Sequence, residues 1–211
     1  MTEIIPAILA YSEKEFDDKV KQIGARASTI QIDVMDGLFV PNRTWADPAA
    51  VAKMRLPYTI EAHLMVADPL PAAQAWVAAG AQRIFVHAEA EGWRAAVQAA
   101  REEEREGGVA VNPNTPLSAI EEVINELDAV LVMGVNPGWS GQPFERLAIA
   151  RVAELRSRYP RLRIEVDGGV NESNARELAA AGADGLVAAS ALFSAKNFEE
   201  SFKALSRAAN S

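Results

Sequence analysis

The chain has 211 residues, of which 49% are apolar and 24% charged, a composition typical of a globular protein of one domain. It contains no cysteine, which excludes a disulfide framework, a thiolate nucleophile, a zinc finger and an iron–sulfur cluster. A net charge of −8 without a basic cluster argues against nucleic acid as a partner. No apolar stretch approaches the ~20 residues of a membrane span. Because the N-terminus also lacks the pattern of a signal peptide, we expect a cytoplasmic protein.

Short apolar or β-branched runs alternate with helical patterns along almost the whole chain. The runs predict strands at residues 4–9, 29–35, 58–65, 83–87, 109–112, 129–133, 162–166 and 185–188. Apolar residues spaced three and four apart predict helices at residues 13–23, 69–79, 93–106, 117–126, 145–158, 172–181 and 197–209, with a shorter, weaker one at 47–54. Gly24, Gly80 and Gly182 stand where three of these helices should end.

This strict alternation predicts an α/β protein with a parallel sheet, because parallel strands need a crossover helix between them. Eight such units form either a closed (β/α)8 barrel or a long open sheet. No GxGxxG or Walker sequence follows any predicted strand, which argues against the open, nucleotide-binding alternative. The sequence therefore predicts a single (β/α)8 TIM-barrel domain over residues 1–211.

Polar residues at the predicted strand ends mark the part of the barrel where active sites lie. By strand parity, Gln31 and Asp33 face the interior from the second strand, and His63 does so from the third. Asp167 stands at the barrel mouth, directly after the predicted seventh strand. Either aspartate alone could cap the next turn, and His63 alone could be a buried structural histidine. Their convergence on one barrel mouth favours a functional site.

Two opposed carboxylates can remove a proton from one face of a carbon and return it to the other face. A proton on the carbon beside a carbonyl is only weakly acidic, so the enediolate that its removal forms needs an electrophile to stabilise it. A divalent metal held by Asp33, His63 and Asp167 would supply one. Small residues after the seventh and eighth strands occupy the usual phosphate position of such barrels. They are Gly168, Gly169, Ala189 and Ser190, and Gly141 adds a backbone amide from the loop after the sixth strand.

Five motifs, in order along essentially the whole chain, resemble those of the ribulose-phosphate 3-epimerase family. They are DVMDGLFVPN at 33–42, AHLMV at 62–66, NPNTP at 112–116, VMGVNPG at 132–138 and EVDGGV at 165–170. The resemblance implies a ribulose-phosphate-binding barrel that interconverts D-ribulose 5-phosphate and D-xylulose 5-phosphate by inversion at C3. It also implies one divalent metal ion (zinc, iron(II), manganese, cobalt or magnesium) and a homo-oligomer.

The resemblance also implies roles for individual residues. Asp33 and Asp167 match the acid/base pair that also ligates the metal, and His63 matches a histidine ligand. The methionines that surround the reacting enediolate match Met35, Met65 and Met133. The contacts to substrate and phosphate match Gly138, Gly141, Gly168, Gly169 and Ser190.

Several positions inside this site depart from the family pattern. Gln31 stands where the family usually has a histidine ligand, and its carbonyl oxygen suits hard cations better than zinc or iron(II). Ala7 lacks the hydroxyl that usually contacts the substrate, and Ala189 replaces a glycine of the phosphate site. Trp139 and Ser140 replace a Phe-Gly pair in the loop after the sixth strand.

These departures leave other hypotheses open beside the epimerase. One is a diverged, metal-poor paralogue that binds phosphosugars without catalysis, and another is an epimerase of a different sugar phosphate. The intact aspartates favour an enzyme. A decarboxylase would need a lysine near Asp33, and none is there. We expect His87 to be a structural histidine within the barrel mouth, and Glu165 to face inward as a supporting partner beside Asp167.

Overall fold

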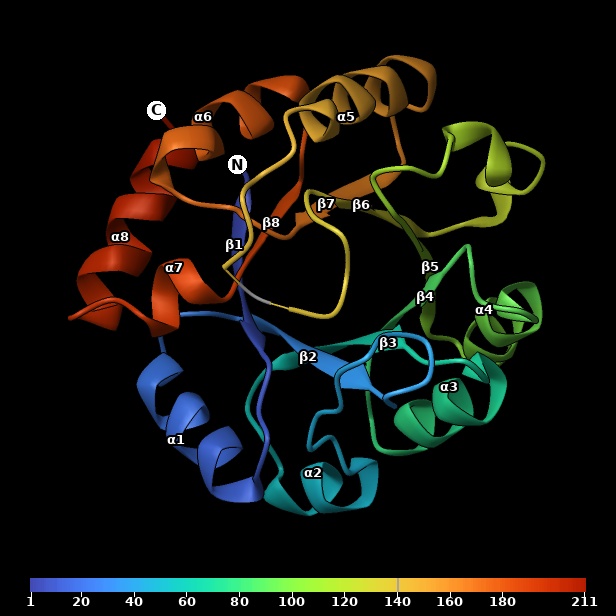
Figure 1. Ribbon diagram of the computed structural model, residues 1–211, viewed down its shortest axis with the longest axis horizontal. Helices are drawn as coiled ribbons and strands as arrows, with labels where there is room; N and C mark the ends of the chain where they lie inside the picture. The colour runs from blue at the N-terminus through green and yellow to red at the C-terminus, as the bar shows by residue number, and fades with distance from the viewer. Residues whose placement is uncertain (140) are drawn as a thin grey trace.

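The computed structural model describes residues 1–139 and 141–211. Eight parallel strands follow one another around a closed barrel, and the last pairs with the first (Figure 1). They are β1 (Glu3–Ile8), β2 (Thr29–Met35), β3 (Thr59–Met65), β4 (Arg83–His87), β5 (Glu106–Val111), β6 (Ala129–Met133), β7 (Arg163–Asp167) and β8 (Gly185–Ala188). The predicted (β/α)8 TIM barrel is confirmed.

Helices surround this barrel on its outside (Figure 1). They are α1 (Glu13–Ile23), α2 (Pro48–Met54), α3 (Pro69–Ala78), α4 (Trp93–Glu102), α5 (Leu147–Arg158), α6 (Glu172–Ala181), α7 (Ser190–Phe193) and α8 (Phe198–Ala209). The short α7 was not predicted. Within residues 1–139 and 141–211, no helix is long and apolar enough to cross a membrane.

Local sequence sets the helix ends. The Ser12 side chain caps α1 by accepting a hydrogen bond from the Glu15 amide, and Asn171 and Asn174 form a reciprocal capping box on α6. Gly182 follows α6 with a φ of 111°, a left-handed conformation that glycine adopts at little cost. These signals explain why the predicted bounds of α1 and α6 match the structure.

The segment between β5 and β6 differs from its prediction. In place of a helix over 117–126, the chain forms two 3-10 turns, η1 (Leu117–Ala119) and η2 (Ile124–Glu126). The apolar spacing is helical, but β-branched Ile120, Val123 and Ile124 lose side-chain freedom in an α-helix, so helix propensity here is weak. Ile120 and Ile124 are nevertheless buried against the barrel.

Strand β5 begins three residues earlier than predicted, which shortens α4. The cause is a glycine pair that gives no apolar strand signal. A Cβ on Gly108 would lie 2.6 Å from the ring of Phe85, so this position on β5 has to be glycine for the ring to fit inside the barrel. Gly108 is therefore required by packing inside the barrel and does not mark a turn.

Alternation along each strand divides the core into two parts. Ile30 and Ile32 face the large apolar layer between strands and helices, whereas Phe85, Leu131 and Met133 belong to a smaller cluster inside the barrel. Each strand therefore places every second side chain in the interior, as the sequence predicts for β2 and β3.

The interior also holds a layer of buried charge beneath the mouth. Arg83 at the start of β4 contacts Glu61 and donates a hydrogen bond of 2.9 Å to Glu165. At the edge of this layer, Arg163 pairs with both Glu165 and Glu3. Glu165 faces inward as predicted, but its partners are arginines of this layer and not Asp167.

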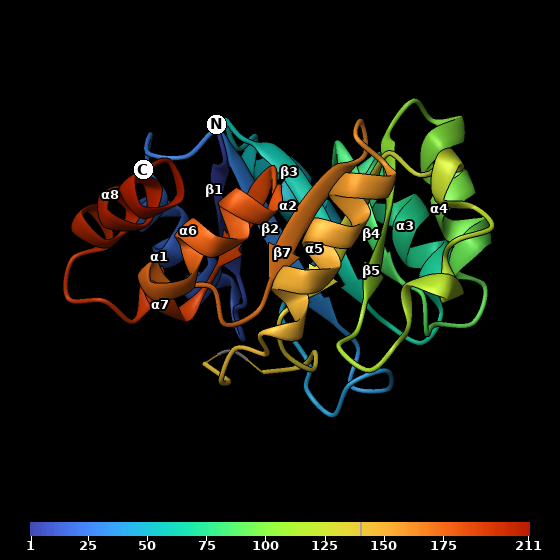
Figure 2. The same ribbon diagram turned by 90° about the horizontal axis from the view of Figure 1, so that it is seen from above.

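Two long loops project from the C-terminal end of the barrel, after β2 and after β6 (Figure 2). They are joined by Asn42, whose amide donates hydrogen bonds to the Gly138 carbonyl at 2.8 Å and to the Tyr11 hydroxyl at 3.0 Å. The strands thus end beneath a partly covered mouth.

Candidate active site

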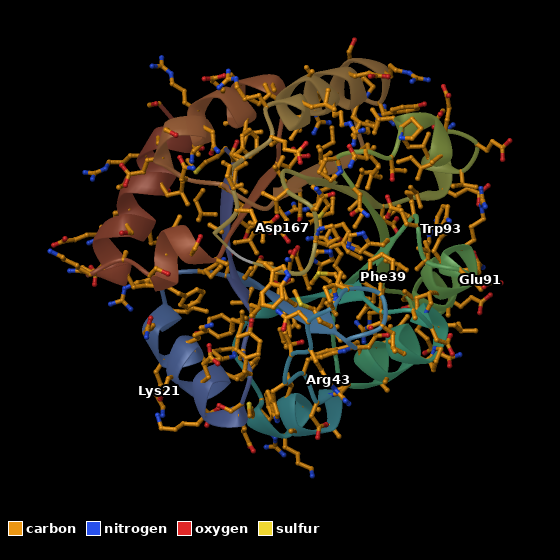
Figure 3. The ribbon with its side chains drawn as sticks, in the orientation of Figure 1. Lys21, Phe39, Arg43, Glu91, Trp93 and Asp167 are labelled. Atoms are coloured by element: carbon orange, nitrogen blue, oxygen red, sulfur yellow. The ribbon has the colours of Figure 1, made fainter. Side chains whose placement is uncertain are left out.

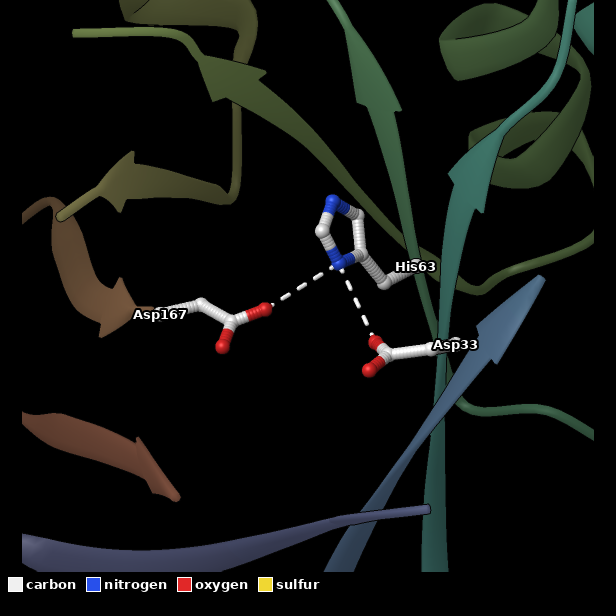
Figure 4. A group of neighbouring side chains, drawn as sticks. All are labelled: Asp33, His63 and Asp167. Carbon is white, nitrogen blue, oxygen red and sulfur yellow. Dashed lines mark hydrogen bonds and ion pairs between the residues drawn. The ribbon is translucent and has the colours of Figure 1, made fainter. Parts of the chain in front are cut away.

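Three strand ends bring Asp33, His63 and Asp167 together at this mouth (Figure 4). The register pairs Asp33 with His63 on neighbouring β2 and β3, and Asp167 ends β7. His63 Nδ1 lies 3.3 Å from Asp33 Oδ1 and 3.2 Å from Asp167 Oδ2. All three residues are buried. Figure 3 shows Asp167 near the centre of the ring of strands, whereas Lys21 lies on the outer rim.

These three side chains fit a divalent cation. One ligand atom from each residue lies within 4.8 Å of the others, and two carboxylates with one imidazole are a common donor set for such ions. The buried Asp-His-Asp group can therefore bind a metal, as predicted.

Gln31 lies against the same group. Its Nε2 donates hydrogen bonds to Asp33 Oδ1 at 2.9 Å and Asp167 Oδ2 at 2.8 Å, and lies 3.3 Å from His63 Nδ1. Its Oε1 is buried with no hydrogen-bond partner. As a predicted metal ligand, Gln31 was expected to offer its oxygen. The structure instead turns its amide nitrogen toward the carboxylates, because two carboxylates attract N–H donors and repel a carbonyl.

His87 contacts His63 and determines which ring nitrogen of His63 donates a hydrogen bond to it. His87 Nδ1 lies 3.3 Å from the Glu89 carboxylate, which only accepts, so Nδ1 carries a proton. Burial lowers the pKa of His87 to about 4, which leaves the ring neutral with Nε2 as an acceptor. His63 Nε2, 2.8 Å away, is therefore the donor, and His63 Nδ1 is the atom turned to the carboxylates. The predicted structural role of His87 thus includes direct contact with the site.

The pKa values of Asp33 and His63 are both raised, but for different reasons. Burial raises the pKa of Asp33, although hydrogen bonds from His63 and Gln31 oppose the rise and the Asp167 charge adds to it. For His63, burial acts to lower the pKa, but hydrogen bonds to Asp167 and Asp33 outweigh it and raise the pKa to about 9. Without a cation, His63 is therefore an imidazolium between the carboxylates at neutral pH.

A pocket opens above these groups. Among the predicted contacts, its walls include Met35, Met65, Met133, Gly138, Trp139, Gly141, Gly168, Gly169, Ala189 and Ser190. Ala7 is buried and lines an adjoining cavity instead, and the buried Gln31 is not among the residues that line the pocket. Ser140 lies outside the described residues.

The backbone after β7 forms part of the pocket wall. Gly168 and Gly169 have φ values of 97° and 70°, and a Cβ on Gly168 would lie 2.5 Å from Val135. Only glycine combines this conformation with such close packing, so the backbone of the pair itself lines the pocket.

Two residues that position the site were not predicted. Thr44 Oγ1 donates to the Asp33 carbonyl at 2.8 Å and accepts from the Met35 amide at 2.9 Å, which ties the loop after β2 to the end of that strand. Asn42 joins this loop to Gly138, as described above. Asn42 is part of a recognised motif, but a motif does not reveal that its amide reaches another loop.

Comparison with known proteins shows the family to which this sequence is related. The model of the ribulose-phosphate 3 epimerase family matches residues 3–193. The chain belongs to this family. It is 40% identical over 206 residues to the ribulose-phosphate 3-epimerase of Aquifex aeolicus (strain VF5), covering 94% of this chain and 93% of that protein. It is 38% identical over 203 residues to the ribulose-phosphate 3-epimerase of Bacillus subtilis (strain 168), covering 92% and 93%. The family members are epimerases, which are isomerase-class enzymes.

More distant solved structures share the barrel. 3-Hexulose-6-phosphate synthase from Salmonella typhimurium superposes with a TM-score of 0.79 at 16% identity, covering 99% of each chain. 3-Keto-L-gulonate-6-phosphate decarboxylase from Vibrio cholerae O1 gives 0.78 at 13% identity, covering 99% of this chain and 97% of the other. At these identities the likeness concerns the fold alone.

Proposed function

We propose that this protein is a ribulose-phosphate 3-epimerase that inverts C3 of D-ribulose 5-phosphate to give D-xylulose 5-phosphate. The observation that carries the proposal is the placement of Asp33 and Asp167. They come from strands that are not neighbours, they converge from two sides on His63, and both line one pocket (Figure 4). Inversion needs this arrangement, since a proton must leave one face of a carbon and return to the other.

The reaction is a proton abstraction followed by a proton return. One carboxylate takes the C3 proton, the C3–H bonding electrons form the C2–C3 double bond, and the C2 carbonyl becomes an enediolate oxygen. The other carboxylate, protonated, then gives its proton to the opposite face of C3. Burial raises the pKa of Asp33, so at each turnover this carboxyl can hold the proton to be delivered. Atoms and charge balance, because one carboxyl gains the proton that the other loses.

Other groups of the chain assist this transfer. A divalent cation held by Asp33, His63 and Asp167 would polarise the C2 carbonyl and stabilise the enediolate oxygens. Met35, Met65 and Met133 line the pocket with soft, polarizable sulfur that keeps water away from the planar intermediate. The turn at Gly168 and the side chain of Ser190 line the same pocket, where we assign the sugar's phosphate.

Deuterium exchange followed by NMR tests this proposal. Ribulose 5-phosphate is incubated in heavy water with the protein and manganese, zinc, iron(II), cobalt or magnesium in turn, and deuterium at C3 and xylulose 5-phosphate are followed together. We expect both to appear. If neither deuterium exchange nor an epimer appears with ribulose 5-phosphate or related ketose phosphates, the epimerase is refuted and a phosphosugar-binding protein is favoured. Exchange without epimer formation would mean that a single carboxylate works, which contradicts the two-base mechanism.

A further inference from the structure

The Gln31 side chain has an unusual balance of hydrogen bonds. Its amide nitrogen donates to carboxylate oxygens of both Asp33 and Asp167, which accounts for both of its protons. Its amide oxygen has no partner although it is buried. A buried carbonyl without a partner is unfavourable, so the carboxylates must decide the orientation of the amide.

The opposite orientation would be unfavourable for the same reason. If the amide turned over about its Cγ–Cδ bond, Oε1 would face two carboxylates and the imidazole would be its single donor. The oxygen and nitrogen of an amide have nearly the same size, so the turn needs no movement of the backbone of β2. The negative charge of the Asp33 and Asp167 carboxylates therefore selects the orientation of the Gln31 amide.

A cation bound among these carboxylates reverses that preference, because it repels N–H groups and attracts a carbonyl oxygen. We propose that the Gln31 amide works in two orientations. It holds the two carboxylates together through Nε2 when the site has no cation, and it turns Oε1 inward as a further ligand when a cation binds. This inference deepens the proposed function, on whose cation site it rests.

The second orientation also determines which cations suit the site. With Gln31 turned, the donor set becomes three oxygens, from Asp33, Asp167 and Gln31, and one nitrogen, from His63. Oxygen-rich sets of this kind suit hard cations such as Mg²⁺ and Mn²⁺, whereas additional imidazole nitrogen favours Zn²⁺ and Fe²⁺. The same amide thus makes the cation-free site stable and biases the loaded site toward hard ions.

NMR of the side-chain amide tests the turn directly. In protein labelled with ¹⁵N, the Gln31 NH₂ pair is assigned by its loss in Gln31→Glu and followed while Mg²⁺ is added, with saturation established by calorimetry. We expect both protons to move upfield as they leave the carboxylates. The NH₂ pair of Gln98, which donates to Glu102 on the outside of α4, is the internal control and should stay in place. An unchanged Gln31 pair at saturating Mg²⁺ would overturn the inference.

Cation affinities give a second measurement. Gln31→Leu keeps the volume without a ligand atom, and we expect its Mn²⁺ dissociation constant to rise about tenfold or more. Gln31→His should raise the preference for Zn²⁺ over Mn²⁺ about tenfold relative to the parent protein. Unchanged Mn²⁺ affinity in the first variant, or an unchanged ratio in the second, would contradict a ligand role. Should Gln31→Leu not fold, the amide resonances of the parent protein decide alone.

Turnover is recorded on the same samples, so the two proposals can fail separately. A parent protein that epimerises but binds no cation would overturn the role of Gln31 and leave the epimerase standing. A parent protein whose Gln31 resonances move with Mg²⁺ but which never epimerises would refute the proposed function and support the two orientations.

Discussion

Removing the hydrogen-bond acceptor behind His63 should weaken the site without touching any group that meets the substrate. In His87→Leu, the Nε2–H of His63 loses its 2.8 Å partner. Both rings are fully buried, so water cannot replace the acceptor. The hydrogen-bond partner of a metal-ligating histidine holds the ring's tautomer and orientation, and its loss typically lowers metal affinity by a factor of about 10–100. We expect the Mn²⁺ affinity to fall by a factor in that range.

A matched variant separates this effect from a change in packing. A glutamine at position 87 reaches about as far as the distal nitrogen of histidine, so His87→Gln restores an acceptor for His63 through its amide oxygen. It should recover most of the affinity that His87→Leu loses. Isothermal titration with Mn²⁺ measures affinity, and kcat and KM are measured at saturating Mn²⁺. Parent-like affinity in His87→Leu, or equal losses in both variants, would refute the argument that His87 orients His63.

Three further predictions concern catalysis, packing and pH. Asp33→Asn and Asp167→Asn should each lower kcat by about 10²–10⁴ because each proton transfer needs its own carboxylate. Asp17→Asn, on the outer helix α1, is the control, and residual activity near that of the parent in either site variant would exclude the two-base mechanism. Gly108→Ala should lower the free energy of unfolding by about 1–3 kcal/mol, because the new Cβ meets the Phe85 ring at 2.6 Å. Urea denaturation measures this loss, and the double variant with Phe85→Leu should regain part of it; an unaltered urea midpoint in the single variant would show that the barrel interior accommodates the methyl group.

The pH prediction concerns Glu3, in the charged cluster below the mouth. Burial acts to raise its pKa, but hydrogen bonds from Thr29, Ser28 and Arg163 outweigh it, and the net pKa is lowered from 4.5. A lowered folded-state pKa stabilises the protein above the unfolded value, and this contribution is lost as the pH falls through the folded value. The difference in urea midpoint between parent and Glu3→Gln should therefore be full at pH 7 and shrink below about pH 4.5. The same difference at pH 7 and pH 3 would contradict this assignment.

The fold and the strand-face positions of the polar site residues could be predicted because both follow from periodic patterns, whereas the residues' roles were implied by the family resemblance. Alternation of runs and helical segments dictates the barrel, and strand parity places Asp33 and His63 on the inner face of β2 and β3. The 3-10 turns within 117–126 could not be predicted from periodicity. The apolar spacing there indicates an α-helix, whereas the β-branched residues lower the helix propensity. The early start of β5 was hidden for a different reason. Gly108 serves packing against Phe85, a contact between strands that no local pattern contains.

Orientation within the site was equally beyond the sequence. The residues reveal that Gln31 faces inward, but whether its oxygen or its nitrogen meets the carboxylates depends on charges from β2 and β7 together. His87 likewise ends its own strand, and only the register between β3 and β4 brings it to His63. Sequence patterns predict which face of a strand a side chain occupies, whereas its contacts and its role as donor or acceptor depend on the three-dimensional set of partners.

The barrel interior holds two layers of buried carboxylates, and they differ in what balances them. In the lower layer Glu165 is paired with Arg83, whose guanidinium is always charged and cannot leave. At the mouth, Asp33 and Asp167 are balanced by His63, whose Nδ1 can give up its proton, and by a neutral amide that can turn. A cation can therefore replace the balancing charge at the mouth while the lower layer keeps its own. This difference explains how two carboxylates can stay close enough for chemistry in a fold whose lower layer remains fixed by permanent charge.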